Sequence, residues 1–138
     1  MVKLVYIVRK RDDVSDAEFH RYWLENHGPL VRSFAKTMRA RKYVQSHAII
    51  AGASAAQMAS ARGMGEPYDG ITEVWWESLE DMTASSPDVD KAARALLEDE
   101  AKFIDLKRST IFVTEEHVVF DYTKESDRRR GPTKKRRR

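Results

Sequence analysis

The sequence predicts an α+β fold whose elements follow one another in the order β-α-β-β-α-β. Two segments have the 3.6-residue periodicity of amphipathic helices, and four others alternate or form the short apolar runs of strands. The chain has 138 residues, enough for one domain and too few for two domains that each need a core. We therefore expect one domain over residues 1–123, followed by a tail.

The first strand, predicted over residues 2–9, carries apolar side chains on both faces. Leu4, Tyr6 and Val8 share one face, and Val5 and Ile7 share the other. A strand of this kind lies in the centre of a sheet that is covered on both sides. In so short a chain, the second cover is predicted to be another copy of the protein.

The first helix is predicted to begin at about Asp16, because Ser15 and Glu18 have the spacing of a capping box. In that box the hydroxyl and the carboxylate each accept one free backbone N–H. The apolar stripe of the helix contains Phe19, Tyr22, Trp23 and Asn26, with His27 at its edge.

Gly28 and Pro29 are predicted to interrupt or kink this helix, because proline removes a backbone donor. A second helical piece is expected from Leu30 to Met38.

Three further strands are predicted over residues 41–50, 71–77 and 109–114, and residues 118–122 form a possible short edge strand. On the third strand, Val74 and Trp76 face one way and Ile71, Glu73 and Trp75 the other. Residues 81–86 allow a short helical turn. Residues 51–68 show neither periodicity and are expected to form a long, functional or mobile loop.

The second full helix is predicted from Asp88 or Asp90 to Leu106. Its stripe contains Ala93, Leu96, Leu97, Phe103 and Ile104, and Glu100 falls near the middle of it. Burial disfavours the charged form of a carboxylate, so an unpaired Glu100 is expected to have a raised pKa. The alternative is a small rotation of the helix that lets Glu100 reach solvent or an arginine.

This order of elements is the ferredoxin-like arrangement, with an antiparallel sheet and both helices on one face. The other face carries Val5 and Ile7, so a homodimer that packs sheet against sheet is predicted.

The chain has no cysteine, which excludes disulfides, iron–sulfur clusters, thiolate zinc sites and cysteine nucleophiles. The glycine-rich and serine motifs of nucleotide-binding proteins and serine hydrolases do not occur. Glu115, Glu116 and His117 lack the spacing of a metal site. Neither a metal nor a cofactor is therefore expected. Without an apolar membrane span or an export signal, a cytoplasmic protein is predicted.

The charge is divided unevenly along the chain. Of 25 basic and 22 acidic residues, nine and two respectively lie in residues 124–138, so the preceding 123 residues are mildly acidic. This basic run holds no aromatic residue for stacking on bases. We expect a solvated, disordered tail, and nucleic-acid binding only weakly through it.

The segment that follows the first strand resembles the EthD family, named for ethyl tert-butyl ether degradation. Its pattern F-x-x-Y-W-x-x-x-H-x-P is met here by Phe19, Tyr22, Trp23, His27 and Pro29. Residues 68–82 and 112–120 also resemble the family, so that the likeness extends over about residues 2–121. It implies a dimeric α+β barrel with a small pocket in each protomer and a role in catabolism or biosynthesis of small organic molecules.

His27 is the first candidate catalytic residue, as a general acid or base beside aromatic side chains that exclude water. The structural alternative is a histidine that interacts with free carbonyls at a helix end. Glu100 is the second candidate, as the proton partner or the orienting group of His27. Candidate substrate-binding residues are Tyr6, Trp23, Tyr43, His47 and Trp76, whereas His20 is expected to face solvent.

The resulting prediction is a small-molecule enzyme with acid–base, lyase-like or cyclase-like chemistry on a small aromatic or polyketide-like substrate. A cofactor-independent oxygenase of a degradation pathway is the first alternative. A non-catalytic accessory protein that binds a ligand is the second.

Overall fold

The computed structural model describes residues 1–49 and 53–123. The predicted basic tail, residues 124–138, lies outside this range. The elements in chain order are β1 (Val2–Val8), α1 (Asp16–Tyr22), the π-helical turn η1 (Trp23–His27), α2 (Gly28–Ser33), β2 (Lys42–His47), α3 (Ala53–Ala61), β3 (Gly70–Trp76), α4 (Leu79–Thr83), α5 (Pro87–Glu100), the 3-10 turn η2 (Leu106–Arg108) and β4 (Thr110–Glu115).

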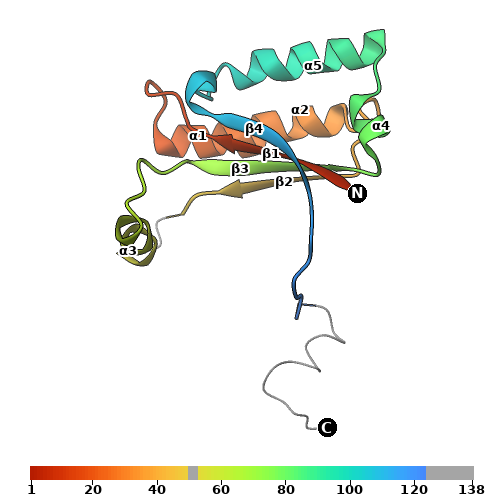
Figure 1. Ribbon diagram of the computed structural model, residues 1–138. Helices are drawn as coiled ribbons and strands as arrows, with labels where there is room; N and C mark the ends of the chain where they lie inside the picture. Colours follow the sequence, from red (N-terminus) through yellow and green to blue (C-terminus); the bar gives the residue numbers. More distant parts are fainter. Residues whose placement is uncertain (50–52, 124–138) are drawn as a thin grey trace.

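The four strands form one antiparallel sheet in the order β2-β3-β1-β4. Helices α1, α2 and α5 lie together on one face of it, as Figure 1 shows. The α+β, ferredoxin-like prediction is thus confirmed, and β1 lies inside the sheet as its two apolar faces indicated.

The core lies between this sheet and the helices. Val8 of β1 is fully buried with Phe19 and Trp23 of the first helix, and with Phe103 and Ile104, which follow α5. The buried side chains of β3 alternate, with Val74 and Trp76 facing the helices as predicted. This packing sets the helices over the strands and fixes the walls of the site described below.

The first helix continues through the predicted break at Gly28 and Pro29. Its turn widens at η1, where the Gly28 N–H bonds the carbonyl of Trp23, and α2 follows directly with Pro29 in its first turn. Proline is tolerated there because a first-turn residue needs no N–H partner. Half of the capping box is present, since the Ser15 hydroxyl accepts the Glu18 N–H, whereas the Glu18 carboxylate binds Arg21.

Three other sequence expectations were wrong. Part of the expected loop, residues 53–61, is the helix α3. Helix α5 ends at Glu100 rather than Leu106, because Ala101 caps it and the chain turns. Residues 118–122 form no strand, and Val118, Val119 and Phe120 are exposed.

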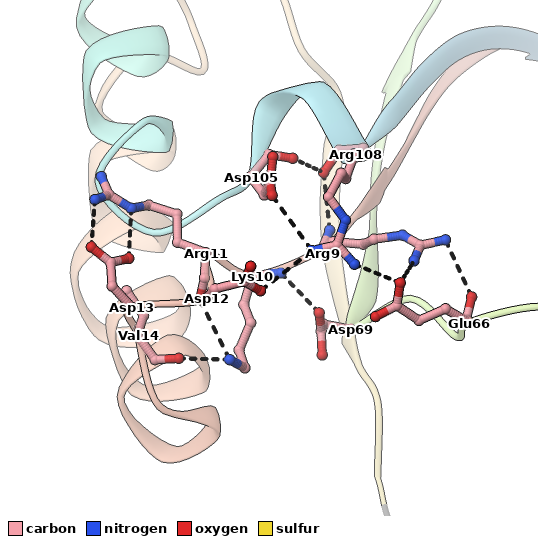
Figure 2. A network of polar contacts seen from close by, with 11 residues as sticks. Arg9, Lys10, Arg11, Asp12, Asp13, Val14, Glu66, Asp69, Asp105 and Arg108 are labelled. Carbon is pink, nitrogen blue, oxygen red and sulfur yellow. Dashed lines mark hydrogen bonds and ion pairs between the residues drawn. The ribbon is translucent and has the colours of Figure 1, made fainter.

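A polar network joins the end of β1 to the segment before β3 and to η2 (Figure 2). The Arg9 and Arg108 guanidinium groups both bind the carboxylate of Glu66. Arg9 also lies over the Tyr68 ring, 4.0 Å from its centroid, and Asp69 accepts the N–H of Lys10 at 2.8 Å. These contacts hold the chain between α3 and β3 against the end of β1.

Within residues 1–49 and 53–123, none of the helices has the length and apolar content needed to cross a membrane. A cytoplasmic location stays a prediction.

Candidate functional site

A cavity of about 170 Å³ lies between the sheet and the helices. Strand residues form its floor, and the end of the first helix and α5 contribute its other walls. Six of the seven candidate site residues line it: Tyr6, Trp23, His27, Tyr43, Trp76 and Glu100. The seventh, His47, does not.

His27 is held in the cavity wall by a carboxylate that the sequence analysis missed. The ring is only 5 % exposed, and its Nδ1 lies 2.7 Å from Oδ2 of Asp99. The other Asp99 oxygen accepts the hydroxyl of Tyr22. Burial opposes the charge of Asp99, yet the hydrogen bonds from Tyr22 and His27 hold its pKa below the usual value.

The protonation state of His27 follows from this contact. Burial lowers the pKa of His27 even though Asp99 acts in the opposite direction, so the ring is neutral at pH 7. Because the ionised Asp99 can only accept, Nδ1 carries the proton and donates it. The Nε2 atom therefore keeps a lone pair that can take up a proton.

Glu100, in contrast to His27, can hold a proton that it donates. Its side chain is half-buried and accepts a hydrogen bond from the Tyr6 hydroxyl at 3.1 Å. Burial, with a smaller contribution from the neighbouring charge of Asp99, raises the pKa of Glu100 to about 7, and the bond from Tyr6 opposes this. A large part of Glu100 is thus protonated at neutral pH, where an ordinary glutamate would be ionised.

Asp99, rather than Glu100, contacts the His27 ring, so the expectation that Glu100 orients His27 was wrong. The reason is the rotation of α5: Ala92 and Asp99 are its buried residues, whereas Leu97 is 54 % exposed. The spacing of Ala92, Leu96, Asp99 and Phe103 is also helical, and this second stripe could have revealed Asp99.

His47 lies outside the cavity, in a contact between β2 and α1. Its Nδ1 is 2.8 Å from Nδ1 of His20, and its ring stacks on Trp23 at 4.2 Å between centroids. Burial, and then the nearby His20, lower the pKa of His47. His20 is therefore a half-buried partner of His47 and not the solvent-facing residue that was expected.

The two adjacent tryptophans of β3 point to opposite faces, as predicted. Trp76 lines the cavity and donates its indole N–H to the carbonyl of Met38. Trp75 lies on the other face beside Lys3 and Lys42, and donates to Glu116.

A larger groove of about 460 Å³ lies between α2 and β2. Its charged lining residues, Arg32, Arg41 and Lys42, are all basic, so it lacks an acid–base pair like that of the cavity. We therefore regard the smaller cavity as the candidate site. In the part of the chain that the structure describes, no three histidine or acidic side chains are grouped to hold a metal ion.

The EthD domain model matches residues 11–107, which cover the first helix, β2, β3, and α5 with its Asp99 and Glu100. The chain belongs to the EthD family. No curated protein matches this EthD chain.

Solved structures share its fold at low sequence identity. An EthD family protein from Bacillus halodurans has 19 % identity and a TM-score of 0.56, over 85 % of this chain and 99 % of that one. An EthD-like protein from Ralstonia eutropha has 16 % identity and a TM-score of 0.57, over 86 % and 93 %. A protein of unknown function from Bacteroides fragilis, described as dimeric and ferredoxin-like, has 15 % identity and a TM-score of 0.53, over 83 % and 95 %.

Proposed function

We propose that this EthD protein is a cofactor-independent enzyme that moves a proton on a small carbonyl compound, in a lyase-like, isomerase-like or cyclase-like reaction. The observation that carries the proposal is the pair of titratable groups in one cavity, His27 with a lowered pKa and Glu100 with a pKa raised to about 7, so that Glu100 is about half protonated at neutral pH. Two groups whose surroundings shift their pKa values in opposite directions form a typical acid–base pair.

In the proposed step, Nε2 of His27 removes a proton from the carbon next to the carbonyl group. The C–H bond breaks, its electron pair forms the C=C bond of an enolate, and the negative charge moves to the oxygen. Asp99 stabilises the protonated ring that results, through the hydrogen bond at Nδ1. Glu100 returns a proton to the enolate and is then reprotonated from solvent, while the protonated His27 ring releases its extra proton to solvent, so that both groups regain their starting state.

The test measures the exchange of α-protons for deuterium in three single-ring ketones, which are acetophenone, phenylacetone and cyclohex-2-enone. Proton NMR gives the rate of exchange. The rate is expected to rise with pH as His27 loses its proton, below pH 6.5, and to fall above about pH 7 as Glu100 loses its own. Glu100→Gln should remove the alkaline fall. A ketone that binds without faster exchange would contradict catalysis and favour the accessory ligand-binding role.

We also propose that the protein is a homodimer that packs through the open face of the sheet. Supporting this, Ile71 and Phe112 are exposed on that face, and Val119 beyond β4 is 90 % exposed. Apolar patches of this kind mark protein interfaces. Sedimentation of the full chain at micromolar concentration is expected to give twice the mass of 16.0 kDa, and a monomer would contradict the dimer.

A further inference from the structure

The direction of one hydrogen-bond chain beside the cavity is fixed by a backbone carbonyl. The side-chain amide of Gln45 lies 2.8 Å from the carbonyl oxygen of Trp23, which can only accept. The atom of Gln45 at this position is therefore the nitrogen, whatever orientation of the amide is assumed.

The same nitrogen lies 2.8 Å from the hydroxyl oxygen of Tyr43. Its two N–H groups are thus used, one toward Trp23 and one toward Tyr43. The amide oxygen lies 2.7 Å from Nε2 of His47, so this His47 nitrogen must be the donor. Every contact along the chain from His47 through Gln45 to Tyr43 therefore donates toward Tyr43.

Tyr43 is the last member of this chain and lines the cavity. Burial raises the pKa of Tyr43, while the hydrogen bond that Gln45 donates to its phenol oxygen opposes the rise. Since Gln45 donates to this oxygen, the hydroxyl hydrogen of Tyr43 is left for an acceptor other than Gln45.

The volume of the cavity limits what that acceptor can belong to. An apolar cavity of about 150 Å³ holds one benzene molecule. A volume of about 170 Å³ therefore matches one six-membered ring with a small substituent better than the fused rings of a polyketide-like substrate.

We infer that the ligand is a single-ring molecule with a carbonyl-type oxygen, and that the Tyr43 hydroxyl donates a hydrogen bond to this oxygen. The inference rests on the proposed function, because it concerns the same cavity. During proton removal by His27, this oxygen gains negative charge, and a donor already directed at it stabilises that charge. Tyr43 would then determine which molecules bind and also assist the step.

The experiment compares acetophenone with α-methylstyrene, which has the same shape but carries CH₂ in place of the oxygen. Tyr43→Phe is expected to weaken acetophenone binding by about 2- to 13-fold, the value of one hydrogen bond, and to leave α-methylstyrene binding unchanged. Ser46→Ala, on the opposite face of the same strand, is the control and should change neither. 2-Acetonaphthone, with its second ring, should not bind.

Infrared spectroscopy provides a second readout on the unaltered protein. The C=O stretch of bound acetophenone is expected at lower wavenumber than in an apolar solvent. Equal losses of both ligands in Tyr43→Phe, an unshifted C=O stretch, or binding of the naphthyl compound would overturn the inference. These are binding measurements, so a failure of catalysis alone would leave their result intact.

Discussion

Replacement of His27 by Gln is expected to reduce α-proton exchange in a bound ketone by about 10²- to 10⁴-fold, the usual contribution of a general base. Glutamine can still donate to Asp99 but has no basic nitrogen in place of Nε2. Because the ring is a cavity wall rather than the proposed oxygen donor, ketone affinity should change by less than about threefold, which is under 1 kcal/mol. The measurement is the deuterium exchange rate at saturating ketone, with affinity determined separately.

The matched control is His117→Gln, which removes an exposed histidine beyond β4 and should leave the exchange rate unchanged. Full exchange activity in His27→Gln would contradict the proposed base. Loss of ketone affinity together with activity would instead assign His27 to binding.

Gly70→Ala is expected to lower the free energy of unfolding by about 3 kcal/mol, the upper end of the usual cost of overpacking. A Cβ atom at this position would lie 2.5 Å from Cζ3 of Trp23 and 2.6 Å from the carbonyl oxygen of Ser46. Neither neighbour can move freely, because Trp23 is fully buried and Ser46 belongs to the adjacent strand. Urea denaturation followed by tryptophan fluorescence measures the change.

Gly65→Ala is the matched control, because no atom lies within 4 Å of its Cβ position. It should change the free energy of unfolding by less than about 0.5 kcal/mol. Equal stabilities of the two variants would show that Trp23 does not depend on the space above Gly70.

The fold was predictable where local patterns agree with the tertiary structure. The stripe with Phe19 and Trp23 and the alternation around Trp76 indicated buried faces correctly. The interruption or kink predicted at Gly28 and Pro29 corresponds to the wide π-helical turn η1 between α1 and α2, and composition does not reveal that the helical path continues through such a turn. The small residues 53–61 lack an apolar stripe, so periodicity gave no sign of α3.

The site was predictable only in part, for a related reason. Glu100 attracted attention because an acid interrupted an apolar stripe, and it does line the cavity. Asp99 was not predicted as a site residue, because the predicted rotation of α5 placed it away from the core. Sequence periodicity determines the rotation of a helix poorly. The contact between His20 and His47 joins a helix to a strand 27 positions later, which no local pattern indicates.

Asp99, the partner of the proposed base, and Glu100, the proposed acid, are consecutive residues in the last turn of α5. One peptide unit therefore joins both, and a rotation of that turn moves both carboxyl groups together. Moving the backbone cannot adjust the two protonation equilibria independently. Separate adjustment must come from the phenols that each carboxyl group contacts, Tyr22 for Asp99 and Tyr6 for Glu100, so substitutions at these tyrosines offer the route to shift the acidic and alkaline limits of activity one at a time.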